Sequence, residues 1–171
     1  KYRYSLISQN TKVSSVKKNI LIFDAKKNSN KLQRILKSLK FFKQEKFIVT
    51  YGDGISNVDI KSLLKFSKNS ECTITSFKTR SQYGHVVLGK NNVLKKFIEK
   101  PFLKEPINIG FYVFKKNIIL KNSTKNIDLE DSLLPKLIKR TKIKSYLHKG
   151  YFYSVDNPKD LNQLKKIYGQ K

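Results

Sequence analysis

Two aspartates carry the clearest chemical signal in the sequence. Asp53 lies between two glycines directly after the apolar run 47–49, and Asp156 follows the apolar run 151–155. Glycine permits backbone angles and close ligand approach that a Cβ would block, and open α/β sheets bind ligands just beyond the carboxyl ends of their strands. Two carboxylates at adjacent strand ends suit Mg²⁺, which takes few hard oxygen ligands from a protein and others from substrate phosphates.

Each aspartate also has a plainer explanation. An Asp-Gly pair often forms a hairpin turn, but residues 58–66 have helical spacing, which favours a turn between a strand and a helix at Asp53. Asp156 could be only a turn residue ahead of the helix that begins at Asn157-Pro158, where proline suits the first position.

A lysine follows another predicted strand. Lys100 lies between Glu99 and Pro101, and the proline ends the strand predicted for residues 93–98 because it cannot continue the ladder. At a strand end its ammonium group could reach a phosphate. It could equally be one more solvated lysine.

The surrounding pattern predicts a sheet with helices between its strands. The first 70 residues have the order strand, helix, strand, helix, which implies a parallel sheet covered by helices. Segment 108–110 interrupts an apolar run and could be a strand kink, and Asp128 is predicted to cap a helix with Asp131 three residues on. Strands are predicted at 19–23, 47–49, 72–77, 86–88, 93–98, 111–114, 142–147 and 151–155, and helices at 31–42 and from 59, 128 and 157.

The charge of the chain does not indicate a nucleic-acid partner. A net charge of +25 would suit nucleic acid or an anionic surface. Only four of the 37 basic residues are Arg, the lysines are spread along the whole chain, and no nucleic-acid-binding motif is present. We therefore do not expect nucleic acid as the natural partner.

The remaining composition bounds the organisation of the chain. The single Cys72 excludes an internal disulfide and is expected to be a small core residue. No apolar run approaches membrane-spanning length and no signal peptide is visible, so we expect a cytoplasmic protein without a membrane partner. Residues 1–18 are predicted to form an irregular basic arm and residues 19–171 a single domain, and without any Met we do not expect Lys1 to be the natural start.

Several short motifs follow one another in an order that is more specific than any one of them. They are segments 47–54, 58–60, 83–84, 97–101, 108–113, 129–130 and 150–156. This order closely resembles the sugar-phosphate nucleotidyltransferases, and Thr-Tyr-Gly-Asp-Gly at 50–54 looks most like their glucose-1-phosphate cytidylyltransferase branch. The resemblance implies a Rossmann-like, mixed and mostly parallel α/β sheet with flanking helices, the nucleotide-diphospho-sugar transferase fold.

The resemblance also implies a reaction. A nucleotidyl group would pass from a nucleoside triphosphate, CTP in this branch, to a sugar 1-phosphate such as glucose 1-phosphate, with release of pyrophosphate, in the service of polysaccharide synthesis. Asp53 and Asp156 would hold Mg²⁺, which neutralises charge on the transferring group, and Lys100 would clamp the sugar phosphate in line for attack. The sugar pocket would be lined by Gly52, Tyr83, Gly84, Glu99, Asn108, Gly110 and Glu130, although Glu130 could instead be a first-turn helix acid favoured by the helix dipole.

Two segments depart from the family pattern. Nothing in residues 1–19 matches the G-G-x-G-T-R loop that cradles the triphosphate, and a βαβ unit needs about 30 residues, so we expect an N-terminally truncated domain with roughly 60 or more residues ahead of Lys1. The family's T-G-G-R-L segment corresponds to residues 28–32, which lack both glycines. The identity of the base therefore stays open.

Other functions also stay open on the sequence. The altered segment 28–31 would suit a homologue that binds sugar phosphates without catalysis. A basic nucleic-acid-binding domain would instead show tight and steeply salt-dependent binding. Guanylyl, uridylyl and thymidylyl transfer and homo-oligomer formation are compatible with the sequence as well.

Overall fold

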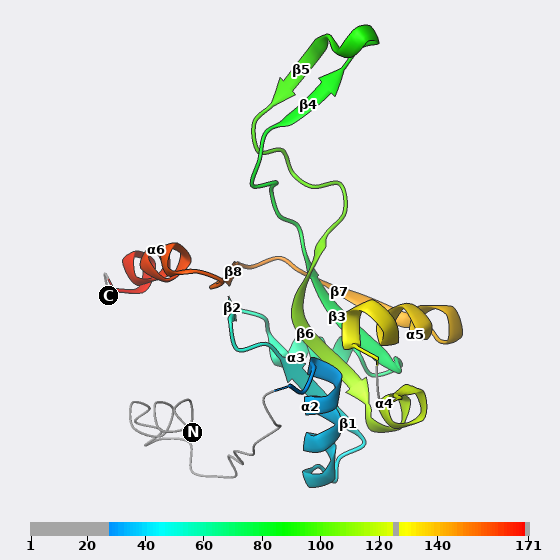
Figure 1. Cartoon of the computed structure of the whole chain (residues 1–171). Coiled ribbons are helices and arrows are strands. Elements are labelled where there is room, and N and C mark those ends of the chain that lie inside the picture. Colours follow the sequence, from blue (N-terminus) through cyan, green and yellow to red (C-terminus); the bar gives the residue numbers. More distant parts are fainter. Residues whose placement is uncertain (1–27, 125–126, 170–171) are drawn as a thin grey trace.

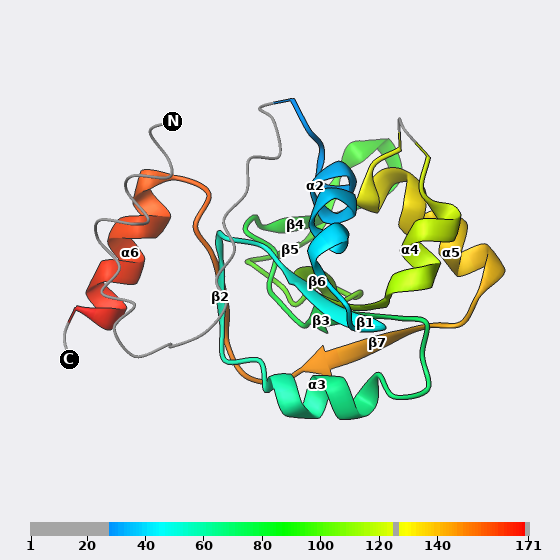
Figure 2. The same cartoon turned by 90° about the horizontal axis from the view of Figure 1, so that it is seen from below.

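The computed structural model describes residues 28–124 and 127–169, which form a mixed sheet with helices on both faces (Figures 1 and 2). In spatial order the strands are β1 (Lys46–Thr50), β6 (Ile107–Lys115), β3 (Cys72–Phe77) and β7 (Ile143–His148). The inner strand β6 runs antiparallel to both neighbours, whereas β3 and β7 are parallel, so three of the four strands point the same way. The predicted mixed, mostly parallel α/β sheet is confirmed.

Helices bury both faces of this sheet. The helices are α2 (Lys31–Ser38) with the 3-10 turn η1 (Leu39–Phe41), α3 (Ile60–Phe66), α4 (Lys116–Asn122), the π-helical turn η3 (Leu129–Leu133), α5 (Leu134–Arg140) and α6 (Pro158–Tyr168). Figure 2 shows α2, α4 and α5 on one face and α3 on the other. The main core lies under the first group, where Leu32, Tyr112, Phe114 and Leu137 are fully buried.

The segment in which the family glycines are absent forms the start of α2. Asn30 accepts a hydrogen bond from the N–H of Gln33 at 2.8 Å, and the Gln33 side chain accepts one from the N–H of Asn30 at 3.1 Å. This reciprocal cap satisfies two backbone donors that a helix start leaves open. Asn30 also donates to the carbonyl of Ile127 at 3.1 Å, so the cap is tied to the segment before η3.

The turn at Asp53 leads first into a strand, not directly into a helix as the sequence predicted. Strand β2 (Gly54–Ser56) pairs antiparallel with β8 (Phe152–Ser154), and α3 begins only afterwards. The prediction missed β2 because it has three residues and no periodicity of its own. Its partner lies at the far end of the sequence.

Two further differences concern β6 and the helices that follow it. Strand β6 begins at Ile107, so segment 108–110 lies within the strand, where residues 109–111 form a bulge opposite the register shift between Ile74 and Ser76. Helix α4 was not predicted, since it begins directly after β6 without a capping side chain. Asp128 does cap the next helix, but it accepts from the N–H of Glu130, at 3.3 Å, and the first turn is π-helical.

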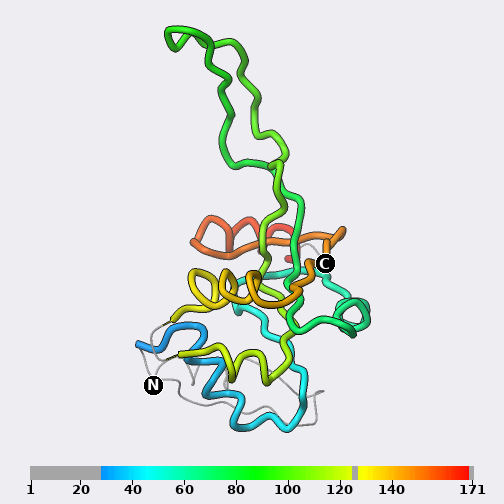
Figure 3. Tube along the Cα trace, turned by 90° about the vertical axis from the view of Figure 1, so that its right-hand side faces the viewer, coloured from blue at the N-terminus to red at the C-terminus, as the bar shows by residue number. Residues whose placement is uncertain are grey.

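Two parts of the chain lie away from the sheet. The strands predicted at 86–88 and 93–98 form a hairpin of β4 (His85–Leu88) and β5 (Leu94–Ile98), with the 3-10 turn η2 (Lys90–Asn92) at its tip, and this hairpin projects from the body (Figures 1 and 3). The predicted C-terminal helix is α6, capped by Asn157, and it lies beside the β2–β8 ribbon (Figure 1). The predicted arm 1–18 and strand 19–23 lie outside the described residues.

None of the helices in the described ranges is both long and apolar enough to span a bilayer.

Burial of Cys72 generates a prediction about its thiol. The side chain is fully buried in the core, as expected, and burial raises the pKa of the thiol to about 12. Because only the thiolate is nucleophilic, we expect the folded protein not to react with a disulfide reagent such as DTNB at pH 8, and to release one equivalent of thiol in denaturing urea. Rapid stoichiometric reaction of the folded protein would contradict this placement.

Candidate functional site

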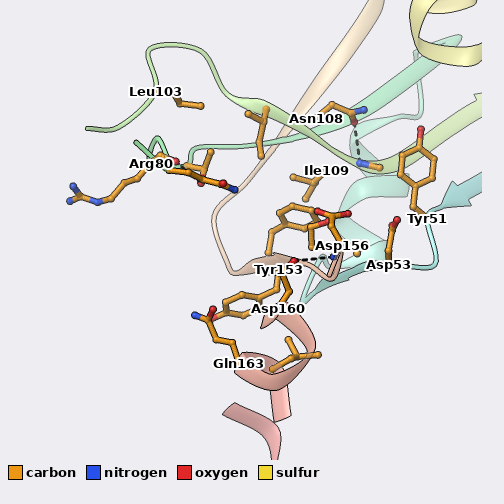
Figure 4. A pocket seen from close by; sticks show the side chains of 18 of the residues that line it. Tyr51, Asp53, Arg80, Leu103, Asn108, Ile109, Tyr153, Asp156, Asp160 and Gln163 are labelled. Carbon is orange, nitrogen blue, oxygen red and sulfur yellow. Dashed lines mark hydrogen bonds between the residues drawn. The ribbon is translucent and has the colours of Figure 1, made fainter. Parts of the chain in front are cut away.

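A cavity of about 690 Å³ opens where β1 ends, beside the start of β6, the β2–β8 ribbon and α6 (Figure 4). Its volume is typical of small-molecule sites. Half of the ten predicted site residues line it, and they come from both halves of the sequence. The lining consists of Tyr51, Asp53, Gly54, residues 79–83, Leu103, residues 107–110, residues 152–154, Asp156, Asp160, Gln163, Leu164 and Ile167.

The β2–β8 ribbon brings the two predicted metal ligands together. Gly54 is paired with Ser154, and the N–H of Val155 donates to the carbonyl oxygen of Asp53 at 2.9 Å. Asp53 directly precedes β2 and Asp156 follows β8, so both carboxylates lie at the same end of the ribbon. Figure 4 shows both side chains in one part of the cavity.

A third carboxylate helps to fix the position of Asp156. The Asp160 side chain accepts hydrogen bonds from the backbone N–H groups of Asp156 and Asn157, at 3.1 and 3.2 Å. In return the Asn157 side chain accepts from the N–H of Asp160 at 3.1 Å, which completes a capping box at the start of α6. Across residues 28–124 and 127–169, no three His, Cys, Asp or Glu side chains gather closely enough to form a metal site by themselves.

The donor set in this cavity fits a magnesium ion that shares its coordination with a substrate. Two carboxylates supply hard oxygen ligands, and Mg²⁺ prefers one or two protein carboxylates with its other positions taken by phosphates and water. A site that held the ion by protein groups alone would need more ligands than Asp53 and Asp156 provide. The residues present therefore suit a metal that arrives with a phosphate ligand.

The opposite wall of the cavity is shaped by the bulge in β6. Gly110 has φ +75°, and a Cβ there would lie 2.5 Å from the ring of Tyr51. The side-chain oxygen of Asn108 accepts a hydrogen bond from the N–H of Gly110 at 3.1 Å (Figure 4). The bulge therefore presents an amide side chain and an aromatic ring at the cavity wall.

Five predicted site residues do not line this cavity. Gly52 lines a neighbouring hollow between β1 and α2 that shares Tyr51 and Asp53 with it. Gly84, Glu99 and Lys100 lie at the base of the β4–β5 hairpin, whereas Tyr83, next to Gly84, does line the cavity. Glu130, the fifth, is engaged with Tyr112 and Lys31.

Lys100 is held beside the cavity by its backbone, not by its side chain. It has φ +45°, an uncommon conformation for a residue with a Cβ. Its carbonyl accepts a hydrogen bond from the Arg80 guanidinium at 3.2 Å, and that guanidinium lies 4.3 Å above the Phe102 ring. The ammonium group is 3.8 Å from the Glu99 carboxylate, and both side chains are well exposed. The lysine side chain is thus exposed at the edge of the cavity, next to the Glu99 carboxylate.

Sequence reasoning missed several cavity residues. Arg80, Gln82, Asp160 and Gln163 all line it but belong to no motif that was singled out. Arg80 is one of only four arginines, which was a usable signal. Asp160 could have been found from the spacing of the capping box that begins at Asn157. Gln163 gave no signal beyond its place on a predicted helix.

The fold and the site define an α/β protein with a ligand cavity at its strand ends and two carboxylates inside that cavity. The sequence matches the nucleotidyl transferase family over residues 2–170, and the chain therefore belongs to this family.

Known proteins that resemble the chain differ in the nucleotide their names specify. The chain is 29% identical over 140 residues to the probable glucose-1-phosphate cytidylyltransferase of Bacillus subtilis, a match that covers 80% of this chain and 55% of that protein. It is 26% identical over 132 residues to the mannose-1-phosphate guanylyltransferase catalytic subunit beta of Drosophila melanogaster, covering 74% of this chain and 36% of that protein. The chain thus spans between about a third and just over half of these relatives.

A solved structure supports the fold. The crystal structure of HddC from Yersinia pseudotuberculosis complexed with GMP-PN aligns with a TM-score of 0.72 and 23% sequence identity, over 98% of this chain and 73% of that one. At this identity the likeness concerns the fold alone.

The contact between Gly110 and Tyr51 predicts a stability effect. We expect Gly110→Ala to lower the free energy of unfolding by about 1–3 kcal/mol, because alanine would be strained at this φ and would clash with the ring. Gly52→Ala is the matched control, since a Cβ there meets no atom within 4 Å; its expected change is within about 0.5 kcal/mol. Urea unfolding measures both, and equal effects of the two substitutions would contradict the strain at Gly110.

Proposed function

We propose that this chain is the sugar-binding and metal-binding part of a sugar-1-phosphate nucleotidyltransferase. The reaction is transfer of a nucleotidyl group from a nucleoside triphosphate to a sugar 1-phosphate, with release of pyrophosphate. The main observation behind the proposal is that Asp53 and Asp156 line the same cavity. Membership of the nucleotidyl transferase family supports it.

In this proposal Asp53 and Asp156 hold Mg²⁺ together with the phosphates of the substrate. The bound ion would stabilise negative charge on the transferring group and help to orient it. The protein contributes a fixed pair of oxygen ligands, because the β2–β8 pairing and the cap on α6 hold the backbone of both aspartates. Asp160 acts on the backbone around Asp156 and does not need to touch the ion.

The sugar phosphate would lie on the β6 side of the cavity. On this side the Asn108 amide and the Tyr83 hydroxyl would face the sugar. Gly110 would let the backbone approach it closely. Lys100 would reach the phosphate from the base of the hairpin, and its exposed side chain and the hydrogen bond from the cavity residue Arg80 to its carbonyl support this role. Its contribution would be to position the attacking oxygen and to balance charge. The resemblance adds Gly52, Gly84, Glu99 and Glu130 to this pocket.

For the substrates we propose CTP and glucose 1-phosphate. The Thr-Tyr-Gly-Asp-Gly segment and the cytidylyltransferase relative from Bacillus subtilis support this choice. The guanylyltransferase relative favours GTP and mannose 1-phosphate as the second candidate pair.

A sugar-phosphate-binding homologue without catalysis is a different candidate, supported by the absence of both family glycines from segment 28–32.

The test is pyrophosphate release by the full-length gene product with Mg²⁺, each of four nucleoside triphosphates, and glucose 1-phosphate or mannose 1-phosphate. We expect the highest kcat/KM with CTP and glucose 1-phosphate. Asp53→Asn and Asp156→Asn should each lower it by about 100-fold or more, because each removes a charged metal ligand worth several kcal/mol.

Asp131→Asn is the control for loss of a carboxylate, since Asp131 is exposed on η3 and does not line the cavity. We expect it to leave kcat/KM unchanged. Magnesium-dependent release that survives both cavity substitutions together would contradict the proposed metal site. Retained sugar-phosphate binding with no turnover of any pair would favour the non-catalytic candidate.

A separate expectation concerns the 171 residues alone. They contain no G-G-x-G-T-R loop to cradle a triphosphate, so we expect the purified chain not to release pyrophosphate from CTP and glucose 1-phosphate with Mg²⁺. A coupled pyrophosphate assay measures this. Sustained release by this chain would show that the glycine-rich loop is dispensable.

A further inference from the structure

The hydroxyl of Tyr112 is the centre of a buried polar network behind the cavity. Tyr112 lies on β6 with its residue fully buried, and its ring stacks on Phe114 with centroids 5.5 Å apart. Its hydroxyl contacts the Tyr51 hydroxyl at 2.9 Å, the Asn108 side-chain amide nitrogen, and the Glu130 carboxylate at 3.3 Å. One phenol oxygen thus joins three polar side chains.

The direction of each hydrogen bond follows from what its partner can do. The Asn108 nitrogen can only donate, and the Glu130 carboxylate accepts, so the Tyr112 O–H points to Glu130. The Tyr51 hydroxyl must then donate to Tyr112. This uses the one donor and both acceptor positions of the phenol. Burial is the largest cause that raises the pKa of Tyr112, which keeps the proton on its oxygen at neutral pH.

The network continues to helix α2. The second Glu130 oxygen is 2.9 Å from the Lys31 ammonium group, which also lies 5.0 Å from the centroid of the Tyr51 ring. The hydrogen bond to Glu130 is the largest cause that raises the pKa of Lys31. Four segments are connected in this way: α2, the end of β1, β6 and η3.

Two residues of this network also line the cavity. Asn108 and Tyr51 both line it, whereas Tyr112, Glu130 and Lys31 do not. The Asn108 amide is fixed at both ends, since its oxygen accepts from the N–H of Gly110 at 3.1 Å and its nitrogen donates to Tyr112. It cannot flip without losing both bonds. Its second N–H and second oxygen lone pair therefore have a set direction.

We propose that Tyr112 is a positioning residue for recognition of the sugar hydroxyls. Its hydroxyl sets the amide orientation of Asn108 and holds the Tyr51 ring over Gly110, so that the cavity wall is ordered before the sugar phosphate binds. Glu130, which the resemblance places in the sugar pocket, acts through Tyr112, and Lys31 keeps its carboxylate in place. This inference rests on the proposed function of the same cavity.

The test separates the hydroxyl of Tyr112 from its ring. Tyr112→Phe keeps the stacking on Phe114 and removes only the central oxygen. In steady-state assays of the full-length gene product with Mg²⁺, we expect the KM for glucose 1-phosphate to rise about 3- to 10-fold, as for loss of one ordered hydrogen bond. The KM for CTP should stay unchanged. Tyr146→Phe, on β7 and outside the cavity, is the matched control and should change neither constant.

A double-substitution cycle tests the indirect role of Glu130. If Glu130 acts through Tyr112, Glu130→Ala combined with Tyr112→Phe should raise the KM for glucose 1-phosphate no more than the larger of the two single effects. Additive effects would show that Glu130 binds the sugar independently. An unchanged KM in Tyr112→Phe, or equal increases for both substrates, would overturn the inference while leaving the proposed function intact.

An independent readout uses the 171-residue chain without turnover. In ¹H–¹⁵N spectra the Asn108 side-chain amide should give two widely separated proton signals in the native chain and in Tyr146→Phe, and a narrower pair in Tyr112→Phe. Identical Asn108 signals in all three proteins would overturn the inference. If the native full-length protein turned over no substrate pair, the proposed function would fail, and this inference with it.

Discussion

The antiparallel pairing of β2 with β8 is the interaction on which the site depends. Its last hydrogen bond, from Val155 to the carbonyl of Asp53 at 2.9 Å, joins two turns that lie far apart in sequence and places Asp53 and Asp156 in one cavity. Two like charges at close range cost electrostatic energy unless a cation lies between them. The lysines that give the chain its net charge of +25 are spread over the sequence, whereas the proposed divalent cation, with its phosphate ligand, would supply compensation at that one point.

Local sequence signals were sufficient to predict the two aspartates, Asp53 and Asp156, but not the pairing of β2 with β8 that brings them together. The apolar run before Asp53 and the Asn157-Pro158 start of α6 are decided by neighbouring residues, and the structure shows β1 and α6 where these signals predicted them. Strand β2 has three residues, too few for a periodicity to appear, and the strand predicted at 151–155 is present as β8 but carries no local signal for its partner. Their register is set by tertiary contact, because Ser56 also donates to the carbonyl of Tyr151 at 2.7 Å. A reader of the sequence could predict the carboxylates but not the ribbon that joins them.

The opposite wall shows a second limit of sequence reasoning. Tyr112 sits in an apolar run and reads as an ordinary core aromatic, and its ring does fill the core. Its hydroxyl acquires a role only because α2, η3 and the end of β1 converge on it. Glu99 and Lys100 show the reverse: their motif predicted a place in the site, whereas a left-handed backbone at Lys100 and the hairpin base leave both side chains outside the cavity lining. Motifs indicate which residue types gather near a site, and packing decides which of them face it.

The most direct measurement of the proposed metal site is the anomalous scattering of Mn²⁺ in crystals of this chain grown with Mn²⁺ and CDP-glucose. Mn²⁺ takes the same oxygen ligands as Mg²⁺. Joint coordination by Asp53 and Asp156 predicts one strong peak within about 2.2 Å of an oxygen of each carboxylate, with the remaining contacts to phosphate oxygens and water. A peak bound by only one of these aspartates, or a bound nucleotide sugar with no peak beside them, would contradict it.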